Sequence, residues 1–503
     1  MQKESVKEMK NYTGRQIVYI PILKEDFEKD VLGSLKTHLR SAISIHNRNI
    51  REIKELEEIY RGKQPIISEK KRYDGSEINN IVVENHAWKQ VNFKTGFMYG
   101  KPLQYSLNNS KEMDDVTILN AYMNDVNKSS LDIDKSHDLY KYGIAYQIVI
   151  PKIGTIEDIE SEAPFVLDNL SCEECCIVYS NDRPRQKLFG LVITKDKESK
   201  NLFNVFLPNR KILLNSKYEK IDDLPQIMDF IAIQEYTLNN ARMGIIELTL
   251  YLQNLVNKLD SGEIDDIEEF VNTFLVFENV QLDDDDTKEL FKELRKERII
   301  AISSNNEKLP AKFSVVQKSL DHNSLNVFYE RIIKALYDIP GVPHSSGNVT
   351  SGGDTGQARL LGNGWENAHN QAQVDTEYLM QYERELLRKI LKICKKYTNC
   401  PINELKASDI SIKFNLNMSD NLLVKTQALL NLDTIKFPKK SALNIVGVTG
   451  DVEGVGNEWE KVVQEQEKKE LEKEQKISSA NAQNNGSNDN NTRKELVNKD
   501  IQE

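Results

Sequence analysis

Two helical patterns flank the segment Pro340-Gly-Val-Pro-His-Ser-Ser-Gly-Asn-Val-Thr-Ser-Gly-Gly-Asp-Thr-Gly356. The segment has no apolar periodicity, and its Gly, Ser, Thr, Asn and Pro content predicts a loop. The pattern before it covers 321–339, with Asp321 as the expected N-cap. The pattern after it repeats apolar residues mostly at steps of three and four, as an amphipathic helix does: Leu361, Trp365, Ala368, Ala372, Leu379, Tyr382, Leu386, Ile390 and Ile393.

The second pattern predicts a helix of roughly 40 residues, about 60 Å long. Gly362 and Gly364, near its start, are the expected places for a bend. We expect such a helix to be too long for the core of one compact domain. A polar loop held between two rigid helices indicates that the chain is part of a large assembly. In that assembly the loop would contact a molecule that moves past it.

The N-terminal half reads as an α+β domain. A long helical pattern at 25–61 is closed by Gly62 and Pro65. Further helices are predicted at 80–99, 111–125 and 129–142. The texture then changes to short β-prone runs, at 146–150, 176–179, 188–194, 202–207 and 230–233.

The middle of the chain predicts two helices that bracket a small excursion. Ile245, Leu248, Leu252, Leu255 and Leu259 form an apolar stripe, and the acidic stretch 263–269 follows it. A small β unit is predicted at 273–278, 299–303 and 313–316, with a charged helix at 287–298. Together with 321–339 this predicts an antiparallel helical stalk that carries a knob.

The C-terminal part begins with a predicted strand at 410–414. Short helices are predicted at 420–432 and 439–446, and a charged one at 458–476. The remainder, which contains Asn-Ala-Gln-Asn-Asn-Gly-Ser-Asn-Asp-Asn-Asn, is of low complexity and is expected to be disordered.

Composition bounds the class of protein. The chain has 503 residues, 39% hydrophobic and 29% charged, so we expect about three globular domains. No signal peptide or membrane span is predicted, and five cysteines suit a reducing compartment. A net charge of −11 and a pI near 5.4 predict that any contact with nucleic acid is weak or sliding.

The sequence lacks the phosphate-binding, zinc-protease and nucleophile-elbow motifs. Cys172, Cys175 and Cys176 could form a zinc site with Cys394 and Cys400, but their apolar surroundings favour buried small side chains. We therefore predict no metal, no cofactor and no enzymatic activity. An enzyme with an unrecognised, metal-dependent site around His344 and the cysteines is the alternative from another class.

Three quoted stretches carry a resemblance to a known family. They are Tyr60-Arg-Gly-Lys-Gln-Pro-Ile66, Asn79-Asn-Ile-Val-Val-Glu-Asn-His-Ala-Trp88 and Phe97-Met-Tyr-Gly-Lys-Pro-Leu103. With the order stalk helix, β knob, stalk helix, polar loop and long helix, the chain resembles the portal proteins of tailed bacteriophages. The likeness is to the portals of long-tailed phages that infect Gram-positive bacteria, and it spans roughly residues 40 to 470.

The resemblance implies a phage portal fold with a wing, a helical stem, a small β-containing clip and a helical crown. In the numbering of this chain it implies an N-terminal wing at 1–240, stem helices at 241–270 and 319–339, a clip at 271–318, a tunnel loop at 340–356, a long wing helix with its return strand at 357–414, a crown at 415–475 and a disordered tail at 476–503.

The family's function implies a ring, usually of twelve subunits, at one capsid vertex of the virion, assembled in the host cytoplasm. Double-stranded DNA would pass through it without sequence specificity during packaging by the terminase large subunit and during later ejection. The other implied partners are head-completion or adaptor proteins, the major capsid protein and scaffolding protein, with no membrane. A head–tail adaptor or a scaffold-like protein is the structural alternative.

Two sets of site residues follow from the resemblance. The DNA-facing tunnel loop would present Val342, Pro343, His344, Ser345, Ser346, Asn348, Thr350 and Ser351. The clip would present charged residues to exchangeable partners: Asp284, Lys288, Lys292, Arg295, Lys296 and Arg298. The loop at 342–354 has no Lys or Arg, which suits transient contact with a polyanion.

Overall fold

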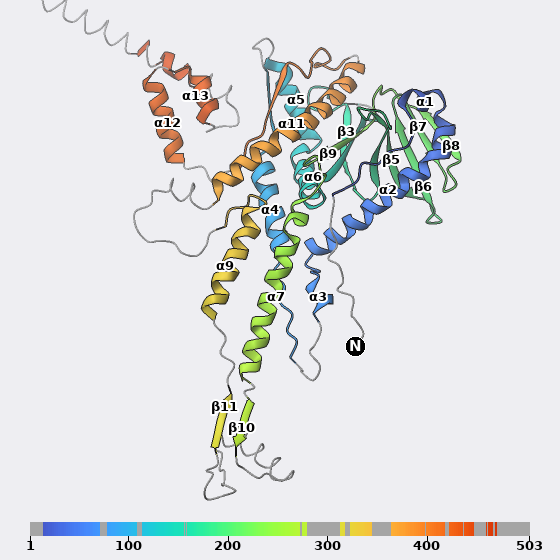
Figure 1. The fold of residues 1–503 in the computed structure, drawn as a ribbon. Helices are drawn as coiled ribbons and strands as arrows, with labels where there is room; N and C mark the ends of the chain where they lie inside the picture. Colours follow the sequence, from blue (N-terminus) through green and yellow to red (C-terminus); the bar gives the residue numbers. More distant parts are fainter. Residues whose placement is uncertain are drawn as a thin grey trace, which may run out of the picture. The chain divides into compact units, whose positions relative to one another are not determined.

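The computed structural model describes residues 14–70, 78–107, 113–154, 156, 158–271, 274–278, 312–316, 322–344, 364–397, 399–417, 422–435, 437–446, 459, 461–465 and 468–469. The chain forms two compact units, residues 1–417 and 418–503. Helices and strands both contribute to the first unit, which makes the protein an α+β protein as the sequence predicts (Figure 1).

The first helical pattern is broken once. α1 spans Lys24–Lys29 and α2 spans Val31–Tyr60, where a single helix was expected. Asp30 causes the break: its backbone is not helical (φ −139°, ψ 82°), and its side chain accepts a hydrogen bond from the backbone N–H of Gly33 at 2.9 Å. The predicted end is confirmed, since Gly62 follows α2 with φ +95°.

α2 buries its apolar side against an antiparallel five-stranded sheet. The sheet is a meander of β4 (Cys175–Tyr179), β5 (Lys187–Lys195), β6 (Asn201–Leu207), β7 (Arg210–Leu214) and β8 (Lys220–Pro225). Their shared core includes Leu35, Leu39, Phe189 and Val205, each at most 1% exposed. β4, β5 and β6 confirm three predicted strands, whereas β7 and β8 were not predicted.

A second, three-stranded sheet has the order β3–β2–β9, with β2 (Ile144–Pro151) between β3 (Phe165–Leu170) and β9 (Ile233–Thr237). The strand predicted at 230–233 is therefore displaced toward the C-terminus. α5 (Met113–Asp125) and α6 (Lys128–Tyr142) confirm two predicted helices. A separate pair joins β1 (Gln104–Leu107) to β12 (Ile410–Lys413).

The long helix α11 lies across the three-stranded sheet (Figure 1). It spans Trp365–Lys396, 32 residues, and is shorter than predicted. Gly364 is its N-cap with φ +81°, so this glycine starts the helix and does not bend it. Ten of its residues are buried, from Ala368 to Cys394. The expectation that it is too long for a compact core is wrong, because it lies within the first unit.

A buried quartet of charges fastens α11 to α6. Glu383 of α11 lies 2.5 Å from Lys135 Nζ and 3.0 Å from Lys128 Nζ. Asp132 completes the quartet, at 2.8 Å from Lys135 and 2.7 Å from Lys128. All four side chains are at most 4% exposed. Two ammonium groups and two carboxylates neutralise one another, and this is the arrangement that buried charges require.

The second unit is described by itself. α12 spans Leu422–Thr434 and α13 spans Lys439–Val446, close to the predicted bounds. Lys439 Nζ lies 4.8 Å from the ring centroid of Trp459, a cation–π contact. Most of the predicted helix at 458–476 and the whole predicted tail at 476–503 lie outside the described residues. Among the helices that the structure describes, none is long and apolar enough for a membrane span.

Candidate functional site: the stem and the root of residues 345–363

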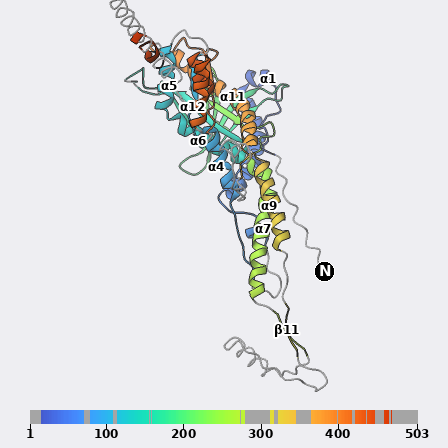
Figure 2. The same ribbon diagram turned by 90° about the vertical axis from the view of Figure 1, so that its left-hand side faces the viewer.

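Two helices of the first unit form an antiparallel hairpin. α7 (Ile245–Val271) leads to the strand β10 (Phe274–Glu278), and β11 (Lys312–Val316) leads back to α9 (His322–Asp338). β10 and β11 pair antiparallel, with Phe277 opposite Phe313. The two helices lie side by side in both views (Figures 1 and 2). This α7–α9 hairpin with its β ribbon is called the stem below.

Apolar residues of both helices hold the stem together near its base. Val256 of α7 packs in one cluster with Ile332, Ile333, Leu336 and Tyr337 of α9. The cluster is closed at its edges by partly buried Phe93, Leu252, Leu259 and Tyr329. Leu336 and Tyr337 are fully buried (0% exposed). Burial of this face accounts for the helical spacing of the apolar residues.

The helix α4 (His86–Tyr99) connects both stem helices to the rest of the unit. Gln90 of α4 donates from Nε2 to the carbonyl of Leu336 at 2.9 Å, and Gln90 Oε1 accepts from Thr249 Oγ1 of α7 at 3.1 Å. Gln90 and Thr249 are both buried. One side chain therefore bridges the two arms of the stem.

Residues before α4 run along α7 instead of forming the predicted start of a helix at Asn80. α7 side chains hold their backbone N–H groups: Asn257 Oδ1 accepts from Glu84 at 3.0 Å, and Ser261 Oγ accepts from Val82 at 2.9 Å. Asp265 accepts from the backbone of Asn80 at 2.7 Å. Because polar side chains of a distant helix satisfy this backbone, helical hydrogen bonds are not needed there.

Asp260 of α7 lies near two other carboxylates, those of Glu84 and Glu263. Asp260 Oδ2 is buried and has no hydrogen-bond partner among the described residues. Burial, and then the nearby Glu84 and Glu263 carboxylates, raise the pKa of Asp260 to about 6. Burial also raises the pKa of Tyr329 to about 12, with Asp260 as the next cause.

The chain leaves α9 in a tight turn. Gly341 N–H donates to the carbonyl of Asp338 at 3.1 Å, and Val342 N–H donates to that of Tyr337 at 2.9 Å. Gly341 has φ +63°, and a Cβ there would approach the Gln371 side chain to 2.9 Å. Glycine suits this position because of its left-handed backbone, and any larger residue would also have to displace the Gln371 side chain.

The two ends of the undescribed segment 345–363 meet at this turn. A Cβ built on Gly364 would lie 3.6 Å from Pro343 Cα. Trp365, the first residue of α11, packs its ring against Phe93 and Phe97 of α4, with centroid distances of 5.7 and 6.0 Å. The segment 345–363 therefore starts and ends at one place, at the base of the stem. This place, formed by residues 341–344 and 364–365, is called the root below.

Aromatic and basic groups surround the last described residue of this turn. The ring of His344 stacks on Tyr337 at 4.6 Å and 18°. A hydrogen bond of 2.8 Å joins Tyr337 Oη to His86 Nδ1, and Lys89 Nζ lies 4.9 Å from the Tyr337 ring. Burial, and then Lys89, lower the pKa of His344 below its ordinary value.

A comparison with known protein families identifies the family of the chain. The model of the family "Phage portal protein, SPP1 Gp6-like" matches residues 39–479, most of the chain. The chain belongs to the phage portal protein family. It is therefore a structural protein of the phage particle, with portal function in DNA packaging, and the resemblance found in the sequence is confirmed. No curated protein matches the chain.

The structure describes three residues of the loop set of this portal protein. Val342 is only 3% exposed and packs in the stem cluster. Pro343 and His344 are half-buried at the root. Five members of the loop set lie outside the described residues: Ser345, Ser346, Asn348, Thr350 and Ser351. The same is true of every member of the clip set: Asp284, Lys288, Lys292, Arg295, Lys296 and Arg298.

Sequence reasoning missed the residues that build the root. Tyr337, Gln371 and Trp365 carry it, yet in the sequence they only continue helical patterns. The single usable signal was the placement of glycines at 341 and 364, both of which have positive φ.

The cysteines of the portal protein are free and buried. Cys172, Cys175 and Cys176 lie in and before β4. Cys394 lies in the last turn of α11, and Cys400 follows the helix, with its Sγ 3.7 Å from Tyr122 Oη. Among the described residues no group of three or more metal-ligating side chains is suitably arranged to hold a metal ion.

Proposed function

We propose that twelve copies of the chain form a ring at one capsid vertex, through which double-stranded DNA is packaged by a terminase and later ejected. The family match over residues 39–479 supports this. The net charge of −11 per copy also supports it, because a ring of like negative charge lets a polyanion slide and not bind.

In this proposal the stem helices α7 and α9 form part of the channel wall. Large apolar side chains are exposed along it, such as Leu255 (36%) and Ile267 (52%) on α7 and Val327 (70%) on α9. Exposed apolar side chains gathered on one element are the kind of surface that a neighbouring subunit covers. We assign residues 1–240 and 357–414 to the wing, 241–270 and 319–339 to the stem, and 415–475 to the crown.

The residues between the stem helices, 271–318, are the proposed clip. The β10–β11 ribbon starts it, and its charged residues 284–298 would dock the terminase large subunit and then head-completion proteins. Capsid and scaffolding proteins would contact the outer parts of the ring during assembly in the host cytoplasm. Exchangeable docking suits a charged surface, because exposed ion pairs contribute little each and are readily replaced.

Residues 340–356 are the proposed tunnel loop. The single observation that carries this assignment is the approach of Gly364 to Pro343, within 3.6 Å of an added Cβ. In this proposal the residues between these two points form a loop tethered at the base of the stem. Its uncharged and mostly polar residues 345–353 would touch the DNA backbone without the counterion release that Lys and Arg contacts bring.

Replacing Ser345–Gly353 with a two-residue Gly-Ser linker tests the loop. Because the root is closed by contacts outside 345–353, we expect rings of unchanged mass and thermal stability, whereas DNA packaging or retention falls. A scrambled segment of the same nine residues is the matched control, and it should keep packaging. Packaging equal to wild type with the shortened loop would remove the loop from the mechanism.

A further inference from the structure

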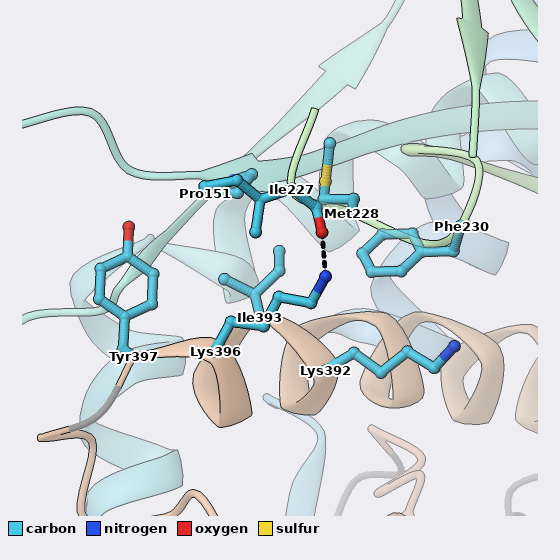
Figure 3. A pocket seen from close by; sticks show the side chains of 8 residues that line it. All are labelled: Pro151, Ile227, Met228, Phe230, Lys392, Ile393, Lys396 and Tyr397. Atoms are coloured by element: carbon cyan, nitrogen blue, oxygen red, sulfur yellow. Dashed lines mark hydrogen bonds between the residues drawn. The ribbon is translucent and has the colours of Figure 1, made fainter. Parts of the chain in front are cut away.

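A small pocket lies in the first unit, away from the stem, between α11 and the loop that precedes β9 (Figure 3). Its volume is about 210 Å³, and its walls are mostly apolar. Lining side chains come from the end of β2, the loop and the last two turns of α11: Pro151, Ile227, Met228, Phe230, Lys392, Ile393, Lys396 and Tyr397.

The pocket is held open by its own framework. Asn209, in the β6–β7 turn, accepts from Gln226 N–H at 2.7 Å and donates to the carbonyl of Met228 at 2.5 Å. From the other side Lys396 Nζ donates to the carbonyl of Ile227 (Figure 3). The loop is thus fixed to both the sheet and the helix, so a ligand does not have to order it.

The size of the pocket limits what it holds. Sites for drug-sized molecules and cofactors have volumes of about 300–1,000 Å³, which exceeds the 210 Å³ found here. The space suits one large side chain, the kind of anchor that fills a pocket at the centre of a protein interface. Ile227 at its lip is 69% exposed, and Ile153 beyond Pro151 is 95% exposed. Both would be covered by a partner.

The charge around the mouth is positive. Lys392 is neutralised by Asp229 at 2.9 Å and lies 5.8 Å from the Phe230 ring centroid. Lys396 donates to a carbonyl and not to a carboxylate. A segment that brings carboxylates on either side of its anchor matches this mouth.

We propose that this pocket binds one aromatic side chain of a partner protein, presented by an acidic segment. The site lies apart from the stem and from the root of 345–363, so it does not depend on the channel. It gives the subunit a specific docking point in addition to the proposed clip.

Saturation-transfer NMR on the assembled full-length protein tests the pocket, with two matched tripeptides as probes. Acetyl-Asp-Trp-Asp-amide should receive saturation at its indole protons, whereas acetyl-Lys-Trp-Lys-amide should receive about fivefold less, from the energy of an exposed ion pair. Equal transfer to both peptides would overturn the proposal.

Two variants place the binding at the pocket. Lys396→Glu should weaken transfer to the acidic peptide about fivefold, while Lys395→Glu, the same charge change one residue away and outside the lining, should leave it near wild type. Ile227→Asp, at the exposed lip, should abolish transfer without any effect on folding in the sheet. A Lys396→Glu signal equal to that of Lys395→Glu, or an unchanged signal in Ile227→Asp, would contradict the site.

Discussion

Replacing Glu383 by Gln removes one of four charges from the buried quartet that joins α11 to α6. Glu383 is 1% exposed, and Lys128, Lys135 and Asp132 around it are at most 4% exposed. Its two lysine partners hold the pKa of the carboxyl near 2, although burial opposes this. Glutamine has nearly the same shape, so the change removes charge and leaves packing intact.

The cost follows from the charge left behind. In the Glu383→Gln variant, two buried ammonium groups share only Asp132, and an uncompensated buried charge costs about 3–5 kcal/mol. Unfolding entropy is about 2.1 cal/mol/K per residue, which gives about 0.9 kcal/mol/K for the 417 residues of the first unit. The expected fall in Tm is therefore about 3–6 °C.

Differential scanning calorimetry of the purified protein measures this shift. Glu377→Gln, at an exposed position of the same helix, is the matched control and should keep the wild-type Tm. The double variant Glu383→Leu with Lys135→Met should recover most of the loss, because it leaves one balanced pair. A Tm for Glu383→Gln equal to that of Glu377→Gln would refute the account of the quartet.

Three further predictions concern stability. Asp260→Asn should raise the free energy of unfolding at pH 7.5 by about 1 kcal/mol after allowing for screening by solvent. The pKa of Asp260 is about 6 in the folded protein, above its ordinary value of 3.8, so its ionisation destabilises the fold as pH rises from 3.8 to 6. The gain should therefore vanish in thermal melts at pH 3.5, where the carboxyl is protonated. The pKa of His46 is about 4 in the folded protein, below its ordinary value of 6.5. The free energy of unfolding should therefore fall by about 3 kcal/mol as pH falls from 6.5 to 4, because the folded state resists protonation of this ring. Thermal melts of the His46→Gln variant should lack this pH dependence. Gly341→Ala should lower the free energy of unfolding by about 2 kcal/mol through its positive φ and its clash with Gln371, whereas Gly96→Ala, in open helix, should raise Tm in the same assay.

Periodicity and capping located most helices from the sequence. α13 spans Lys439–Val446 as predicted, and α9 at His322–Asp338 departs from the predicted 321–339 by one residue at each end. These helices have apolar residues at helical spacing, a signal that local sequence carries by itself. The positive φ of Gly62 likewise confirms the end of the first long helical pattern.

Contacts between distant segments decided what the sequence could not show. α4 starts at His86 and not at Asn80, because Asn257 and Ser261 of α7 hold the preceding backbone. β8 has mostly exposed residues on both of its faces, so it has no alternation to detect. The charged residues of the quartet were not predicted to be buried, because the quartet is complete only when Glu383 of α11 meets Lys128 and Lys135 of α6.

The candidate site divides in the same way. Composition predicted a loop at residues 340–356, but it could not show that Val342 turns back into the stem cluster. It also could not show that Gly364 returns to Pro343. Those facts depend on Trp365 packing on α4, a contact between residues more than 250 positions apart.

Assembly around a central hole is the claim on which the proposed function depends most. Negative-stain electron microscopy of the purified protein at micromolar concentration, with mass photometry of the same sample, tests it most directly. We predict top views of closed rings with an open centre and a mass of about twelve subunits. A single species at the 57.8 kDa of one chain would contradict the account.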